Sequence, residues 1–129
     1  MTLSGTVTFL LLAVAACSGA NSTATPTAKV KHTVQFFAEG TETKWAAVTM
    51  RTESGGTTQF TPDLPMKTKA GEVGLSFDTY PSGSLLYFSM QNKEGYGSVT
   101  CRIVVDGAKV DEVTSSGGYT IATCQGRVP

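Results

Sequence analysis

The side chains through which this 129-residue sequence could do chemistry are three cysteines, one histidine and ten acidic residues. His32 stands where a low-complexity segment meets the first predicted strand, which is a poor place for a preorganised base, and we expect it to be solvated. Paired carboxylates could come from Asp63, Glu72, Asp78 or Glu94, but no spacing favours any pair. The sequence holds neither a phosphate loop nor a serine nucleophile elbow, so we predict a protein without catalytic activity.

Cys17 follows an apolar segment at the start of the chain. Met1 to Ala16 contains no charged residue, and its apolar run is about half of the roughly 20 residues that a membrane-spanning helix needs. A short apolar run that ends in small residues is typical of a secretory signal peptide. The sequence Val14-Ala15-Ala16-Cys17 resembles a bacterial lipobox, which implies cleavage before Cys17 and a diacylglycerol on its thiol. The alternatives are an ordinary signal peptide that contains a cysteine and a buried apolar segment.

The residues after Cys17 are small and polar. Ser18 to Ala28 holds no aromatic and no large aliphatic side chain, so it cannot bury apolar surface. We therefore predict a lipoprotein signal peptide over 1–16, a lipidated flexible tether over 17–31 and one folded domain over 32–129. The expected location is the extracytoplasmic side of the cell membrane, held there by the acyl chains on Cys17.

Charge and composition exclude several classes of partner. Lys plus Arg and Asp plus Glu are ten each, and this balance argues against a nucleic-acid binder and against a polybasic membrane clamp. One histidine and three cysteines are too few for most metal sites, so we expect no metal and no cofactor. Fourteen glycines and 16% charged residues are typical of strands joined by tight turns.

Apolar and polar residues alternate with period two from about Lys31, and no window keeps a helical spacing. The predicted strands are 33–38, 44–51, 57–60, 64–68, 72–80, 85–90, a hairpin around 106–107, and 119–124. In that hairpin, Asp106-Gly107 favours a two-residue type I′ turn, which places Ile103 opposite Val110 and pairs Arg102 with Asp111. A catalytic or calcium-binding Asp106 is the less expected alternative. The sequence predicts an all-β fold.

Cys101 and Cys124 are the cysteines that remain free if Cys17 is acylated. In an exported protein such a pair is expected to form a disulfide. A metal pair or a redox-active dithiol is less expected, because there is no Cys-x-x-Cys motif and no histidine nearby.

The C-terminal third resembles the MmpS family, the small accessory partners of the actinobacterial MmpL exporters. The resemblance rests on Gly97-Ser98-Val99-Thr100-Cys101-Arg102-Ile103-Val104-Val105-Asp106-Gly107, on Ser115-Ser116-Gly117-Gly118-Tyr119 and on Cys124. Farther upstream, Leu64-Pro65-Met66 stands where the family often has Leu-Pro-Trp. The resemblance implies an immunoglobulin-like antiparallel β-sandwich of about seven strands that works by contact with an MmpL-like transporter. Mycobacterial members usually have an N-terminal transmembrane helix, whereas this chain has the sequence Val14-Ala15-Ala16-Cys17 that resembles a lipobox.

Aromatic residues supply the predicted contact surface, which we place at Trp45, Tyr80, Tyr96 and the loop 81–84. Adjacent rings such as Phe36-Phe37 must point to opposite faces of a strand, so one ring either lies exposed or packs under a loop. Two functions follow from these expectations. The first is a non-catalytic accessory module for a membrane exporter of lipids or siderophores. The second is a surface or prophage-encoded lipoprotein that blocks a foreign component, as in superinfection exclusion.

Overall fold

The computed structural model describes residues 28–129, and within that range every regular element is a strand. The eight strands are β1 (Lys31–Thr41), β2 (Ala46–Arg51), β3 (Thr57–Phe60), β4 (Leu75–Pro81), β5 (Leu85–Asn92), β6 (Ser98–Val105), β7 (Ala108–Ser116) and β8 (Ile121–Arg127). The predicted all-β fold is confirmed, with eight strands in place of about seven. The predicted signal peptide, Cys17 and residues 18–27 of the predicted tether lie outside the described residues.

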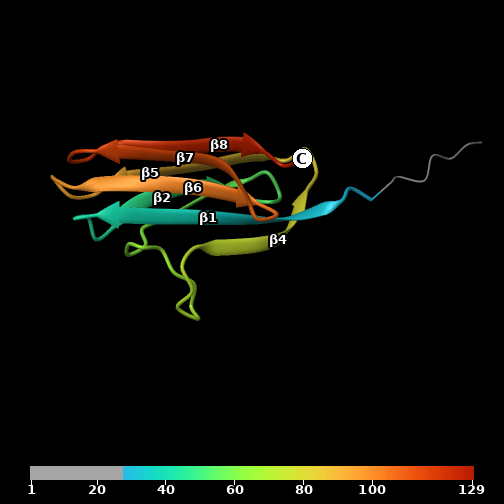
Figure 1. The fold of residues 1–129 in the computed structure, drawn as a ribbon, viewed down its shortest axis with the longest axis horizontal. Helices are drawn as coiled ribbons and strands as arrows, with labels where there is room; N and C mark the ends of the chain where they lie inside the picture. The colour runs from blue at the N-terminus through green and yellow to red at the C-terminus, as the bar shows by residue number, and fades with distance from the viewer. Residues whose placement is uncertain (1–27) are drawn as a thin grey trace, which may run out of the picture.

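The strands form two antiparallel sheets of four strands that pack face to face as a β-sandwich (Figure 1). The order in one sheet, which we call the β1 sheet, is β4-β1-β6-β7. The order in the other, the β2 sheet, is β3-β2-β5-β8. Each sheet therefore combines strands from both halves of the sequence.

The core lies between the two sheets and follows from the period-two pattern. On β1, Val34, Phe36 and Ala38 are buried while the residues between them reach the outer face. The ring of Phe36 lies 5.3 Å from that of Phe88 on β5, so the two sheets touch through aromatic side chains. Burying a side chain of this size stabilises the fold by about 2–3 kcal/mol.

A disulfide joins the sheets through the core. Cys101 on β6 and Cys124 on β8 are fully buried, and their sulfur atoms are 2.09 Å apart. The predicted pairing of these two cysteines is confirmed.

The hairpin between β6 and β7 has the predicted turn but not the predicted register. Val105 pairs with Ala108, and Asp106 and Gly107 both have positive φ, as the turn requires. The register then shifts by one residue, because Val110 forms a β-bulge. Val110 instead packs against β8, where a Cβ on Gly126 would lie 2.3 Å from the Val110 Cγ1 atom.

The bulge overturns the predicted pairing of Arg102 with Asp111. Arg102 now lies opposite Glu112, and its guanidinium binds the carboxylates of Glu112 and Glu39 at 3.3 Å and 3.1 Å. The Asp111 carboxylate accepts a hydrogen bond from the backbone N–H of Gln125 on β8 instead.

The predicted strand 64–68 is wrong, because this segment belongs to a long connection between β3 and β4. Its anchor is Met66, which is buried and donates its backbone N–H to the carbonyl oxygen of Ala38. The same connection covers the outward ring of Phe37, since a Cβ on Gly74 would lie 2.8 Å from that ring. The second ring of the Phe36-Phe37 pair thus packs under a loop.

The two ends of the sandwich differ. At the N-terminal end, Lys31 of β1 pairs with Pro81, next to the β4–β5 turn and close to the β6–β7 turn. At the opposite end, which we call the loop end, β1 finishes at Thr41 opposite Ser98. The loop end gathers three connections, 42–45, 93–97 and 117–120, at the left of Figure 1.

Candidate binding surface

Each connection at the loop end carries one exposed aromatic side chain. Trp45 is 49% exposed, Tyr96 58% and Tyr119 62%. We call these three residues the aromatic loop platform. Exposed rings are enriched in surfaces that bind partners, because they bury a large area for a small loss of side-chain freedom.

A buried asparagine fixes two of these connections. Asn92 at the end of β5 is fully buried, and its Nδ2 atom donates to the carbonyl oxygens of Tyr96 and Gly117 at 2.7 Å and 3.0 Å. Its Oδ1 atom accepts the backbone N–H of Glu94 at 2.9 Å. One side chain therefore holds the backbone of both loops in place.

Further contacts tie in the third connection. The Lys44 backbone N–H donates to the Glu94 carboxylate at 2.8 Å, and the Thr43 hydroxyl donates to the Tyr96 carbonyl oxygen at 3.2 Å. Gly118 lies against Gly95 so closely that a Cβ would be 2.4 Å from the Gly95 carbonyl oxygen. The loops are held together by hydrogen bonds between side chains and backbone and by this close backbone contact, so the aromatic loop platform is preorganised.

The structure brings together two of the three predicted contact residues. Trp45 and Tyr96 lie in neighbouring loops, since the Lys93 backbone N–H donates to the Trp45 carbonyl oxygen. Tyr80 does not join them and is 1% exposed, because it points inward from β4 at the other end of the sandwich, where the loop 81–84 also lies. The prediction that Tyr80 contributes to an exposed contact surface is wrong.

Tyr80 has a structural role in the sandwich. Its hydroxyl donates to the carbonyl oxygen of Arg51 at 2.8 Å, which links β4 of the β1 sheet to β2 of the β2 sheet. Burial, with a smaller contribution from the charge of Glu53, raises the pKa of Tyr80 to about 12.

Sequence reasoning missed Tyr119 and Asn92. Tyr119 follows Gly117-Gly118 and has positive φ, so the glycine pair before an aromatic residue was the signal for an exposed turn. Nothing in the sequence distinguished Asn92, whose role depends on three backbone groups from two loops meeting around it.

The outer face of the β2 sheet, which adjoins the loop end, carries few charged residues. Among the outward positions of its four strands the charged residues are Arg51 and Arg127, both toward the N-terminal end. The remainder of this face consists of hydroxyl, amide and apolar side chains, among which Ile121 is exposed.

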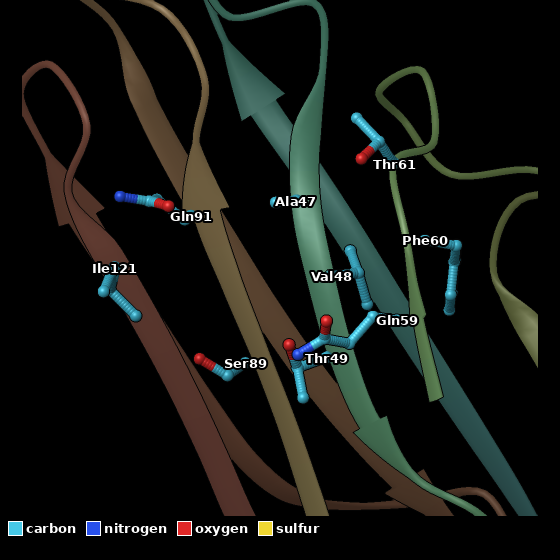
Figure 2. A pocket seen from close by; sticks show the side chains of 9 residues that line it. All are labelled: Ala47, Val48, Thr49, Gln59, Phe60, Thr61, Ser89, Gln91 and Ile121. Carbon is cyan, nitrogen blue, oxygen red and sulfur yellow. The ribbon is translucent and has the colours of Figure 1, made fainter. Parts of the chain in front are cut away.

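An open trough of about 450 Å³ lies on this face (Figure 2). It is lined by Ala47, Val48, Thr49, Gln59, Phe60, Thr61, Ser89, Gln91 and Ile121. Ala47 on β2 pairs with Gln91 on β5, and Gln91 pairs with Ile121 on β8, so one small side chain lies beside two longer ones across three strands. The Gln91 amide lies 3.4 Å from the Tyr119 carbonyl oxygen, which joins the trough to the aromatic loop platform.

The outer face of the β1 sheet has the opposite character. The Arg102 guanidinium binds Glu39 and Glu112 and lies 4.4 Å from the centroid of the Phe37 ring. Hydrogen bonds from Lys109 and then from Arg102 hold the pKa of the Glu112 carboxyl below its usual value. The charged groups of this network are paired with one another.

His32 is not the solvated residue that the sequence predicted. Its Nδ1 atom lies 2.6 Å from the Asp106 carboxylate and its Nε2 atom 2.9 Å from the Ser82 hydroxyl, and the side chain is largely buried. Hydrogen bonds from His32 and from the Thr33 backbone lower the pKa of Asp106. The start of β1 packs between two turns, which is why the imidazole finds partners there.

This Asp–His–Ser series has the order of a nucleophilic relay. The backbone N–H groups of Ser82, Gly83 and Ser84 donate to the carbonyl oxygens of Val30, Val128 and Pro81. These amides are therefore engaged and cannot stabilise an oxyanion beside Ser82. The series acts as a clamp that fastens the start of β1 to the β4–β5 and β6–β7 turns.

No group of three or more histidine, cysteine or acidic side chains among residues 28–129 could hold a metal ion. Within the same residues, we find no helix with the length and hydropathy that crossing a bilayer requires.

Comparison of the sequence with protein-family models gave no match, and comparison with curated proteins gave none. The resemblance to the MmpS family therefore stays an expectation drawn from the residues quoted above.

Proposed function

We propose that the protein is a lipid-anchored, extracytoplasmic and non-catalytic binding module, which serves as an accessory to a membrane exporter of lipids or siderophores. The anchor is the diacylglycerol expected on Cys17, and the module is the β-sandwich. The MmpS-like sequence around Cys101 supports the choice of an exporter as partner.

The observation that carries the proposal is the aromatic loop platform. Trp45, Tyr96 and Tyr119 are exposed and lie at the end of the sandwich remote from residue 28. Asn92 fixes the loops of Tyr96 and Tyr119, and hydrogen bonds from Thr43 and Lys44 tie the loop of Trp45 to them. An anchored domain that presents rigid aromatic side chains away from its anchored end is suited to reach a neighbouring protein.

The charges beside the aromatic loop platform are balanced, so we expect its rings to contribute most of the binding energy. The three connections carry two acidic and two basic residues, namely Glu42, Glu94, Lys44 and Lys93. Such a balanced surface gives little electrostatic steering, so the expected binding depends weakly on salt concentration.

The test uses the full-length protein in its own host. Deleting the gene is expected to lower export of a lipid or siderophore, and the wild-type protein should co-purify with the exporter. Replacing two rings in Trp45→Ala/Tyr119→Ala should reduce co-purification at least tenfold, because aromatic anchors at interfaces contribute about 2 kcal/mol or more each. The matched control is Tyr87→Ala. It removes a less exposed ring from β5 of the β2 sheet, at the N-terminal end of the sandwich.

Two results would overturn the proposal. One is unchanged export after deletion together with the lack of an exporter in the purified complex. The other is resistance to related phage on expression of the protein alone, with export unchanged, which would favour superinfection exclusion instead.

A further inference from the structure

The trough on the outer face of the β2 sheet has a chemical character that the proposed function does not use. We propose that it is a binding site for a neutral saccharide, a function distinct from contact through the aromatic loop platform. Its volume of about 450 Å³ lies within the range of about 300–1,000 Å³ that small-ligand sites occupy.

The polar lining consists of amides and hydroxyls. Gln59 and Gln91 stand on opposite sides of Ala47, with Thr49 and Ser89 between them (Figure 2). An amide offers both donors and an acceptor, and a hydroxyl offers one donor and two acceptors. This is the set that the hydroxyl groups of a sugar require, since each of them also donates and accepts.

The trough also has apolar surface. Ile121 forms a wall on β8, and Ala47 on β2 keeps the floor low beside its longer partner Gln91 on β5. The Phe60 ring does not contribute to this surface, because Phe60 pairs with the buried Val48 and packs against the core. A sugar ring presents C–H groups on its faces, so apolar surface beside hydrogen-bonding groups matches both its C–H faces and its hydroxyl groups.

The lack of charge in the lining decides against other ligands. None of the nine lining residues carries a carboxylate, an ammonium, a guanidinium or an imidazole group. An ionic ligand would lose hydration without gaining a partner of opposite charge. A wholly apolar ligand would cover the amides and hydroxyls without giving them hydrogen bonds.

Several of these groups are open to a ligand. The structure assigns the side chains of Gln59, Thr49 and Thr61 no hydrogen-bond partner among residues 28–129, whereas Ser89 bonds to the Thr123 hydroxyl at 3.0 Å. Gln59 is exposed on the edge strand β3, so removing its amide does not disturb the core.

The experiment titrates the full chain, in micelles of a detergent without a sugar headgroup, with maltohexaose, mannohexaose and cellohexaose. Isothermal calorimetry and the side-chain amide signals of isotope-labelled glutamines report binding. We expect saturable binding of at least one hexasaccharide, with signal shifts at Gln59 and Gln91. Gln59→Ala and Gln91→Ala should each weaken binding about tenfold, as loss of one or two hydrogen bonds implies.

The matched control is Gln125→Ala, which removes an outward amide from the same sheet outside the trough and should leave binding unchanged. A second comparison uses an acidic hexasaccharide, hexagalacturonate, which should bind more weakly than the neutral ones. The proposal is overturned if none of the three neutral hexasaccharides binds, or if hexagalacturonate binds best. It is equally overturned if Gln59→Ala and Gln91→Ala bind as the wild type does.

Discussion

The two outer faces of the sandwich differ in whether their polar groups are already paired. On the β1 sheet, the Arg102 guanidinium binds Glu39 and Glu112 and stacks on Phe37, so this network is complete within the molecule. On the β2 sheet, uncharged amides and hydroxyls line an open trough that continues toward the aromatic loop platform. The charged groups of the β1 sheet stabilise the fold by pairing with one another, whereas the β2 sheet keeps some side chains, such as Gln59 and Thr49, free to bind a ligand.

Removing the disulfide should have the largest effect, and it should act on both faces alike. Cys101 and Cys124 join the β1 sheet to the β2 sheet through β6 and β8. In the chain-entropy model, closing a loop of this length stabilises by about 3 kcal/mol. The double variant Cys101→Ala/Cys124→Ala should lose about this free energy of unfolding in urea titration. A loss below about 1 kcal/mol would show that the sheets do not depend on this link.

Removing the side-chain amide of Asn92 should destabilise the loop end alone. Asn92→Ala leaves the Glu94 N–H and the Tyr96 and Gly117 carbonyl oxygens without their partner, which costs about 2 kcal/mol. Hydrogen exchange should speed up in residues 93–97 and 117–120 and stay unchanged around Arg102. Equal acceleration on the β1 sheet would contradict the independence of the two regions.

Removing the guanidinium tests the paired face. Arg102→Met keeps the apolar stem but loses both ion pairs and the contact with the Phe37 ring, so we expect a loss of about 1 kcal/mol. Co-purification with a partner and saccharide binding should not change. Weaker binding in this variant, measured beside the wild type, would place a functional role on the paired face.

Acid should have the smallest effect, through the two carboxyls whose pKa values are lowered in the fold. Asp106 and Glu112 have folded pKa values below their unfolded ones, so their contribution is present above the usual carboxyl range, near pH 4. It is lost as the pH falls through the folded values. Asp106→Asn/Glu112→Gln should therefore show a shallower fall in the urea midpoint between pH 5 and pH 2.5.

The control for the acid experiment is Glu72→Gln, which lies exposed in the connection between β3 and β4. The urea midpoint of this variant should fall between pH 5 and pH 2.5 with the same slope as that of the wild type. An identical slope for wild type and the Asp106/Glu112 double variant would mean that these hydrogen bonds do not persist in solution.

Local patterns predicted the fold well. Period-two alternation located most strands, the cysteine count gave the pairing of Cys101 with Cys124, and Asp106-Gly107 gave the turn. The register beyond that turn could not be predicted, because the bulge at Val110 depends on the lack of a side chain at Gly126 of another strand. Long-range contacts of this kind leave no local signal.

The candidate surface was predicted only in part, for the same reason. Trp45 and Tyr96 were identified as exposed rings, but Tyr80 alternates into the core and Tyr119 was overlooked. Which rings share one end depends on strand order, and this order places β5 beside β8 although β6 and β7 lie between them in the sequence. His32 gained its partners from two turns that are distant in the sequence.

The proposal that a partner binds at the aromatic loop platform and not at the β1 sheet is tested most directly by photo-cross-linking of the full-length protein in the membranes of its host. Benzoylphenylalanine replaces Trp45 at the loop end in one variant, and Ser76 or Thr114 on the outer face of the β1 sheet in two others. We expect one defined cross-linked membrane protein from position 45 and none from positions 76 and 114. Cross-linking to that protein from the β1 sheet, with none from position 45, would contradict the account.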